Sequence, residues 1–155
     1  MRRAVNSDLP AITRIYNEAI QTTTATFDTK RQTVRQRARW FEMHGRRYPV
    51  IVAEIDGRLV GWACISPWSE RAAYNVTGET SFYVKSESIG RKLKSHITAE
   101  ARQLGYHSLI ARVAEGSDAS LHINKSAGYK QIGTMREVGR KFGKLLDVHI
   151  LQEIL

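Results

Sequence analysis

Apolar residues in this chain recur at helical spacing in four segments. Between residues 7 and 19 they return every three or four positions behind Ser7, a residue type that caps helix starts well. Thr33 and Gln36 have the form of a capping box, which predicts a second helix ending near His44. Residues 88–104 repeat the helical pattern with Gly105 placed to end it, and a shorter helix is predicted over residues 118–126.

The remaining apolar segments have the length and composition of strands. They are predicted at residues 2–5, 49–55, 58–66, 77–84, 108–113, 129–136 and 145–154. Asp56-Gly57 is a strong signal for a two-residue hairpin, and the threonine-rich residues 22–27 are expected to form a loop. The elements alternate without a linker or repeat, which predicts one mixed α/β domain over residues 1–155, with about four helices flanking a sheet.

Charge and composition narrow the class of protein. The 24 basic and 15 acidic residues give a net charge of +9, which attracts anions such as phosphorylated cofactors or nucleic acid. Aromatic residues make up 8% and no nucleic-acid motif is present, so a nucleic-acid binder is the weaker of these hypotheses. The chain has no apolar run long enough to span a membrane and no signal-peptide core, and Cys64 cannot form an internal disulfide, so a cytoplasmic protein is expected. The histidines lack metal-ligand spacing, and no metal site is expected.

Four stretches of sequence carry a family resemblance. Residues 8–29 (DLPAITRIYNEAIQTTTATFDT), 61–66 (GWACIS), 73–84 (AYNVTGETSFYV) and 135–152 (MREVGRKFGKLLDVHILQ) resemble phosphinothricin-acetyltransferase-like enzymes of the GNAT superfamily. The resemblance extends over residues 2–153. It implies a twisted, mostly antiparallel sheet that is splayed in its middle, with acetyl-CoA in the splay, and often a homodimer.

The resemblance also implies where the pyrophosphate of acetyl-CoA binds. Family members carry a loop of the form Arg/Gln-x-x-Gly-x-Gly/Ala ahead of the third helix, where helix amides favour anions. Here only Gly90 matches, and the connection is several residues shorter. Either the loop is shortened, with charge from Arg91, Lys92 and Lys94 replacing the missing amides, or residues that belong there are missing from the sequence.

Other cofactor contacts are implied at one strand end and on the fourth helix. Tyr83 and Val84 end a strand whose main chain pairs with the pantetheine arm in the family. Ser117 and Ser120 stand where family members carry an Asn and a Ser that touch the cofactor, although for Ser117 a helix-capping role is favoured. Asn124 replaces a tyrosine that protonates the leaving thiolate in many superfamily members.

Glu79 is the candidate general base, because it occupies the position of the family's strand glutamate. A carboxylate inside an apolar strand is costly unless it is paired or functional, and Phe82 and Val84 are expected to desolvate it. Thr80 replaces a histidine found directly after this glutamate in many relatives. The amine substrate must lose a proton before it attacks the thioester, and Glu79 is predicted to accept it.

Four residues are candidates for the substrate pocket. Arg71 matches a family position near the substrate, and arginine suits capture of a carboxylate. Tyr74, Phe27 and Thr26 are expected to line the same pocket. Each of Arg71, Tyr74 and Phe27 also has an ordinary interpretation as a surface charge or a packing residue.

The function that the resemblance implies is N-acetyl transfer from acetyl-CoA to a small amino-acid-like amine of the phosphinothricin, methionine sulfone or methionine sulfoximine type. The alternative is a catalytically degenerate relative that binds ligand without turnover, as the short pyrophosphate loop suggests. Within the enzyme class, the amine of a protein N-terminus or lysine is a further possible acceptor.

Overall fold

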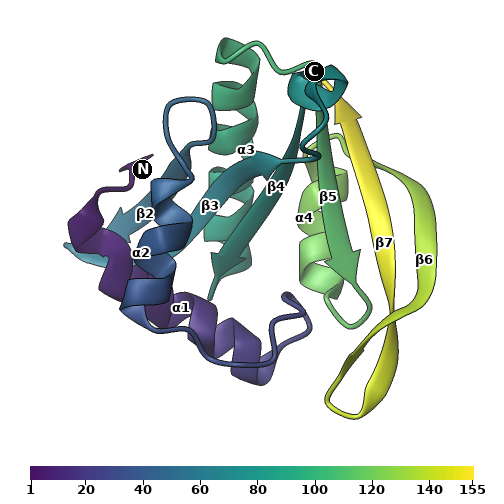
Figure 1. Ribbon diagram of the computed structural model, residues 1–155, viewed down its shortest axis with the longest axis horizontal. Helices are drawn as coiled ribbons and strands as arrows, with labels where there is room; N and C mark the ends of the chain where they lie inside the picture. The colour runs from purple at the N-terminus through teal and green to yellow at the C-terminus, as the bar shows by residue number, and fades with distance from the viewer.

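A computed structural model describes residues 1–155, and its elements follow the predicted order (Figure 1). The strands are β1 (Arg2–Arg3), β2 (Val50–Ile55), β3 (Arg58–Pro67), β4 (Thr77–Val84), β5 (Ser108–Ala114), β6 (Lys130–Lys141) and β7 (Lys144–Ile154). The helices are α1 (Leu9–Thr22), α2 (Val34–Glu42), α3 (Glu87–Gln103) and α4 (Asp118–Ser126), with short 3-10 helices at Asn6–Asp8 and Ala72–Val76. The predicted α/β class with a mostly antiparallel sheet is confirmed.

Local sequence signals set most of the element ends. The capping box at α2 forms as predicted: the Gln36 amide donates to Thr33 Oγ1, and the Thr33 amide donates to Gln36 Oε1. Asp56 and Gly57 both have positive φ, as the turn of the β2–β3 hairpin requires. Ser7, by contrast, does not cap α1, which begins at Leu9, and the predicted role of Ser7 is wrong. Asp8 organises this end instead, by accepting from the Val5 amide and pairing with Arg2.

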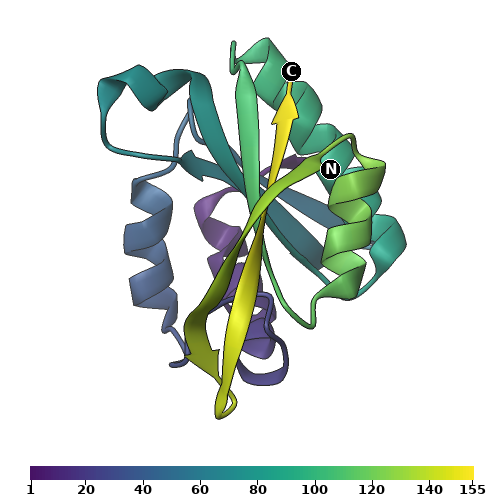
Figure 2. The same cartoon turned by 90° about the vertical axis from the view of Figure 1, so that its right-hand side faces the viewer.

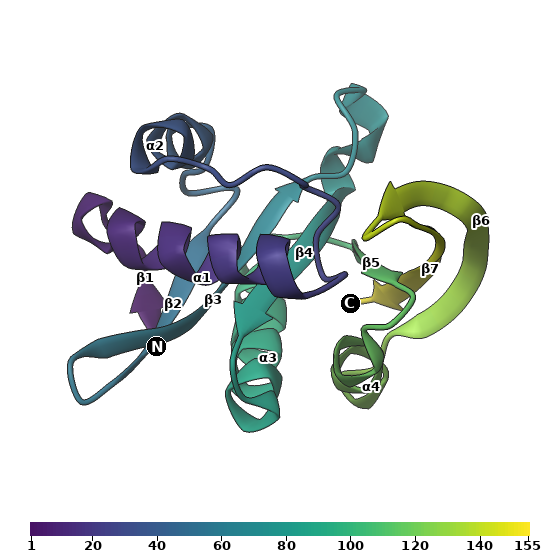
Figure 3. The same ribbon diagram turned by 90° about the horizontal axis from the view of Figure 1, so that it is seen from below.

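Helices cover both faces of the sheet (Figure 3). On one face α1 packs against β2 and β3 through a cluster centred on Ile12, Val52 and Trp62. On the other face α3 supplies Leu93 and Ile97 to a larger cluster, which is closed by β5 and β7. Each cluster is made of apolar side chains at strand or helix spacing, so burial of these two stripes fixes the layers.

The sheet opens between β4 and β5, which form its one parallel pair. The strand order is β1-β2-β3-β4-β5-β7-β6, and the β4–β5 pairing is confined to Thr77–Ser108, Gly78–Leu109 and Glu79–Ile110. Beyond Glu79 the two strands diverge into the V that Figure 1 shows between them. The predicted splay in the middle of the sheet is therefore confirmed, and Glu79 lies at its narrow point.

The last two strands are longer than predicted and form a twisted hairpin (Figure 2). They meet at Phe142 and Gly143, which both have positive φ and make a two-residue turn. Near that tip, Lys141 Nζ donates to the carbonyl oxygens of Thr23 (2.7 Å) and Thr26 (2.6 Å) and so holds the loop after α1. No helix in the structure is both long enough and apolar enough to cross a lipid bilayer.

Candidate active site

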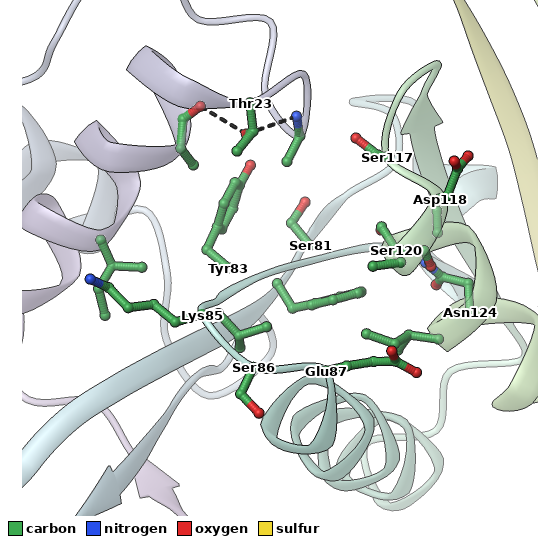
Figure 4. Close-up of a pocket in the computed structure, with 18 of the residues that line it drawn as sticks. Thr23, Ser81, Tyr83, Lys85, Ser86, Glu87, Ser117, Asp118, Ser120 and Asn124 are labelled. Atoms are coloured by element: carbon green, nitrogen blue, oxygen red, sulfur yellow. Dashed lines mark hydrogen bonds between the residues drawn. The ribbon is translucent and has the colours of Figure 1, made fainter.

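A cleft of about 500 Å³ occupies the V between β4 and β5 (Figure 4). Its walls come from the end of α1, from β4 and the start of α3, and from β5 and α4. We call the narrow point at Glu79 and Arg112 the inner end, and the side formed by Lys85, Ser86 and Glu87 the outer end. The cleft is thus long and open at one side, a shape that suits an extended chain more than a compact ligand.

All five of the predicted cofactor residues on the strand and the fourth helix line this cleft. Tyr83 and Val84 lie on the β4 wall, and Ser117, Ser120 and Asn124 lie on the α4 side. Figure 4 shows Tyr83 and Ser81 projecting from one wall toward the space that Ser120 and Asn124 border from the other. The resemblance therefore selected residues that the fold brings together from distant parts of the chain.

Ser117 does not act as the favoured helix cap. Its side chain makes no capping hydrogen bond, and its Oγ instead lies 3.0 Å from Thr24 Oγ1. Thr24 Oγ1 also donates to the carbonyl oxygen of Glu115, at 2.7 Å. These contacts join the loop after α1 to the loop before α4 and form one rim of the cleft.

Asn124 carries an unpaired polar atom in the cleft wall. The residue is 1% exposed, and its Nδ2 donates to the carbonyl oxygen of Ser120 at 2.8 Å. Its Oδ1 is buried without a hydrogen-bond partner. A buried acceptor without a donor is costly, and a ligand N–H or S–H that reached it would remove that cost.

The outer end differs from the prediction. Only Lys85 and Ser86 connect β4 to α3, which confirms that the connection is short. Gly90 is buried and does not line the cleft. A side chain at this position would meet Ile123 Cδ1 at 2.7 Å and Val84 Cγ2 at 3.2 Å. The structure thus assigns Gly90 a packing role between α3 and α4.

The basic residues of α3 do not line the cleft in this structure. Arg91 pairs with Glu87 at 2.9 Å and borders a separate smaller cavity, while Lys92 is exposed on the solvent side. Lys94 is fully buried and donates to Thr80 Oγ1 at 2.6 Å, with its ammonium 3.6 Å from the centre of the Tyr129 ring. Burial lowers the pKa of Lys94 well below its ordinary value. None of the three lines the cleft, so their supply of charge to a diphosphate stays a prediction.

Charge at the outer end comes from other residues. Lys85 lines the cleft and pairs with Glu18 at 3.0 Å. Glu87 lies in the first turn of α3, where it pairs with Arg91 and lies 3.6 Å from His122 Nε2. The outer end therefore presents helix amides, Ser86 and Lys85 together with two carboxylates, those of Glu18 and Glu87.

Glu79 lies at the inner end in a two-point ion pair. Arg112 Nε donates to Glu79 Oε1 at 2.6 Å, and Arg112 Nη2 donates to Glu79 Oε2 at 2.8 Å. Phe82 and Val84 do not desolvate Glu79 as expected, because they pack with the cluster on the α3 face, whereas Glu79 alternates to the other face. The environment of Glu79 is thus set by a guanidinium rather than by apolar neighbours.

The predicted substrate residues lie outside the cleft. Arg71 and Tyr74 are exposed at the 3-10 helix before β4. Phe27 packs against Gly139 of β6, where an added side chain would overlap its ring. Thr26 is buried and its Oγ1 lies 2.9 Å from the Tyr16 hydroxyl. The structure does not bring these four residues to the space between β4 and β5.

Sequence reasoning missed Arg112 and Glu87, which the structure places at opposite ends of the cleft. For Arg112 a signal was present: it is a charged residue within the apolar strand 108–113, the same signal that singled out Glu79. Glu87 carries no comparable signal, because an acidic residue in the first turn of a helix is ordinary.

The fold is that of a mixed sheet that splays between its parallel strands, with a cleft in the splay. Residues 1–150 match the family model described as "Acetyltransferase (GNAT) domain". The chain is 35% identical to the L-amino acid N-acyltransferase MnaT of Escherichia coli, over 98% of this chain and 91% of that protein. It is also 35% identical to phosphinothricin N-acetyltransferase of Alcaligenes faecalis, over 97% of this chain and 79% of that protein.

Solved structures agree with the sequence relatives. The acetyltransferase yncA of Salmonella typhimurium, whose structure contains its cofactor acetyl-CoA, superposes with a TM-score of 0.95 at 34% identity, covering 99% of this chain and 92% of that one. The chain belongs to the GNAT acetyltransferases, among relatives of the phosphinothricin-acetyltransferase type.

Proposed function

We propose that this protein transfers an acetyl group from acetyl-CoA to the primary amine of a small amino-acid-like substrate, of the phosphinothricin, methionine sulfone or methionine sulfoximine type. One observation carries the proposal: β4 and β5 part beyond Glu79, and Arg112 in the wall of the cleft between them holds the Glu79 carboxylate. Relatives that act on amino acids and on phosphinothricin support this acceptor class.

The cleft fits the arm of acetyl-CoA. Beyond Glu79, the main chain of β4 has no β5 partner on the cleft side, so its polar groups are available to the amides of a pantetheine chain. The unpaired Asn124 Oδ1 adds an acceptor for an N–H of that chain. At the outer end, the first amides of α3 and Lys85 would meet the diphosphate, with Glu87 as an opposing charge.

Glu79 is the proposed general base of the reaction. An amine attacks a thioester only as the free base, so an ammonium substrate gives up its proton to Glu79, directly or through water. The amine nitrogen then bonds to the carbonyl carbon and gives up its second proton to water, the carbon–sulfur bond breaks, and coenzyme A leaves as thiolate. Thiols ionise near pH 8.5, so a thiolate can leave without the acid that Asn124 cannot supply.

Turnover with a panel of amines tests the proposal. Purified protein is mixed with acetyl-CoA and phosphinothricin, methionine sulfone, methionine sulfoximine, other amino acids or a peptide N-terminus, and free thiol is followed. We expect release of thiol with at least one amino-acid-like amine. Absence of turnover on every amine by well-folded protein would contradict the proposal.

A degenerate relative is the second candidate, and the outer end favours it specifically. The two-residue connection offers fewer amides than a glycine-rich loop, and Glu87 faces the site of an anion. Calorimetry with acetyl-CoA separates the candidates, because an active enzyme must bind acetyl-CoA and no detectable binding would favour the degenerate relative.

We further propose a homodimer in the cytoplasm. The β6–β7 hairpin exposes Ile132, Val138, Phe142 and Leu145 by 45% to 58%, an apolar surface that a second copy could cover. Analytical ultracentrifugation tests this, with Phe142→Ser expected to shift the protein toward monomer. The unpaired thiol of Cys64, which is buried, suits a reducing compartment.

A further inference from the structure

Arg112, the ion-pair partner of the candidate base Glu79, itself lines the cleft. Ala111 and Val113 beside it belong to the core on the α3 face, so Arg112 projects from the other face of β5, as Glu79 does from β4. The two side chains meet across the point where the strands part. Arg112 also lines the cleft and is 52% exposed, whereas Glu79 is 14% exposed.

The guanidinium has unused hydrogen-bonding capacity toward the cleft. Glu79 takes the Nε and Nη2 edge of Arg112, and Nη1 has no partner in the protein. A half-exposed ion pair contributes little to stability, so structural support alone gives weak reason for a charge here. A planar guanidinium binds a carboxylate at two points through whichever edge is free.

Few other cations could bind an anionic group of a substrate at the inner end. Lys85 and Arg112 are the two basic residues that line the cleft, and Lys85 belongs to the outer end. Arg71 lies outside the cleft, and the ammonium of Lys141 is already used by two carbonyl oxygens.

We propose that Arg112 determines substrate specificity by binding the carboxylate of an amino-acid-like amine in exchange for part of its contact with Glu79. The pair presents a carboxylate and a guanidinium side by side, which is the complement of a zwitterion. The substrate carboxylate takes the guanidinium, and Glu79 is released to accept a hydrogen bond, and then a proton, from the neighbouring ammonium. The proposal rests on the proposed function and adds a selectivity: amines that lack an anionic group are poor substrates.

Matched substrates and variants test this role. L-methionine sulfone and its methyl ester present the same side chain and amine, with and without a carboxylate. For Arg112→Gln we expect the KM of the acid to rise by about 10- to 100-fold, as for loss of a charge-assisted hydrogen bond, while the KM of the ester changes less than about threefold. Arg112→Lys keeps the charge without the planar fork and is expected to recover the acid only in part.

Two further variants provide controls. Arg58→Gln removes an equal charge from the exposed β2–β3 hairpin and is expected to leave both substrates unchanged. Arg71→Gln tests the competing arginine. An equal loss for acid and ester in Arg112→Gln, or a loss confined to the acid in Arg71→Gln, would overturn the proposal even if the wild type is an active acetyltransferase.

Binding provides a readout that does not require turnover. Calorimetry of methionine sulfone against the protein is expected to show binding that Arg112→Gln weakens by a similar factor and that the methyl ester lacks. This arm decides the role of Arg112 even if no amine is acetylated. A ligand whose affinity is the same for wild type and Arg112→Gln, with both proteins equally stable in thermal melts, would exclude it.

Discussion

The two ends of the cleft differ in the charged side chains they present and in how those side chains are paired. At the inner end, two strands part, a carboxylate and a guanidinium make two hydrogen bonds of 2.6 and 2.8 Å, and Arg112 keeps free donors toward the ligand. At the outer end, a two-residue connection leads into α3, Lys85 is paired with Glu18, Glu87 adds a second carboxylate, and no glycine-rich turn is present. The difference teaches that recognition of the acyl acceptor and of the cofactor diphosphate can vary separately within one fold.

Removing the carboxylate at the inner end is expected to have the largest effect. Glu79→Gln should lower turnover by about 10- to 1,000-fold near neutral pH, because the ammonium loses its proton acceptor. The loss should shrink at high pH, where more of the amine is already free base. Rates of thiol release across the pH range measure this, with Glu54→Gln on the exposed end of β2 as the matched control. An equal loss at every pH would show that Glu79 shapes the site rather than accepting a proton.

A fully buried lysine, Lys94, lies next to the inner end of the cleft. Lys94 projects from α3 to Thr80, directly after Glu79 in β4, and burial lowers its pKa. We expect Lys94→Met to raise the free energy of unfolding by about 1–4 kcal/mol at neutral pH, as apolar replacements of buried charges often do. Thr80 Oγ1 would keep its contacts with the Tyr129 hydroxyl and the Ile110 carbonyl oxygen.

The lowered pKa of Lys94 predicts how the stability gain of Lys94→Met depends on pH. Because the pKa of Lys94 is lowered in the folded state, the unfolded chain binds the proton more tightly, and wild-type stability rises with pH up to the unfolded pKa of 10.5. The stability advantage of the Lys94→Met variant over the wild type is therefore expected to be largest at low pH and to diminish as pH rises. Urea unfolding of both proteins at several pH values measures the difference. A constant difference would show that the lysine stays in one protonation state throughout.

The helical period of α3 explains why its basic residues lie in different environments. Gly90, Leu93, Lys94, Ile97 and Ala101 share the buried stripe of α3, so the period of the helix places Lys94 in the core and Arg91 in a different direction. Counting charge near the helix start without following that period grouped the buried Lys94 with the exposed Arg91 and Lys92. The order of strands and helices was predictable because caps, turns and hydrophobic periodicity each depend on residues that are close together in the sequence.

Contacts between strands explain what could not be predicted. Residues of β4 and α4 in the cleft were indicated by resemblance, but the partner of Glu79 depends on which β5 residue lies opposite the end of β4 pairing. That register is set by the whole sheet and not by residues near 79 or 112. For the same reason Arg71 looked suitable by type, and the fold placed it outside the cleft.

Loss of Asn124 Oδ1, in the wall of the cleft, is expected to have a smaller effect on acetyl-CoA binding. Asn124→Ala removes the unpaired Oδ1, so acetyl-CoA should bind about 5- to 10-fold more weakly if that atom accepts a hydrogen bond from the ligand. The variant also loses the hydrogen bond from Nδ2 to the Ser120 carbonyl oxygen, so the free energy of unfolding without ligand should fall by about 0.5–1.5 kcal/mol. Calorimetry and urea unfolding provide the two readouts. A loss of stability with unchanged affinity for acetyl-CoA would indicate that Asn124 supports α4 and does not contact the ligand.

The smallest expected effect has the opposite sign and lies at the outer end. Glu87→Gln removes a carboxylate from the first turn of α3 and releases Arg91, so acetyl-CoA should bind about 3- to 10-fold more tightly at low salt. The helix itself should lose about 0.3–1 kcal/mol, since an acidic residue favours a helix N-terminus. Calorimetry at two salt concentrations measures the gain, which screening should reduce.

Glu100→Gln is the matched control for this change, because it removes the same charge from the same helix at a distance from the cleft. If both variants tighten binding equally, the effect comes from net charge, and the outer end has no special place for the diphosphate. If Glu87→Gln alone tightens it, the diphosphate lies at the first turn of α3. The weak outer end is then a cofactor site whose affinity is held down by one side chain rather than a site that the short connection has abolished.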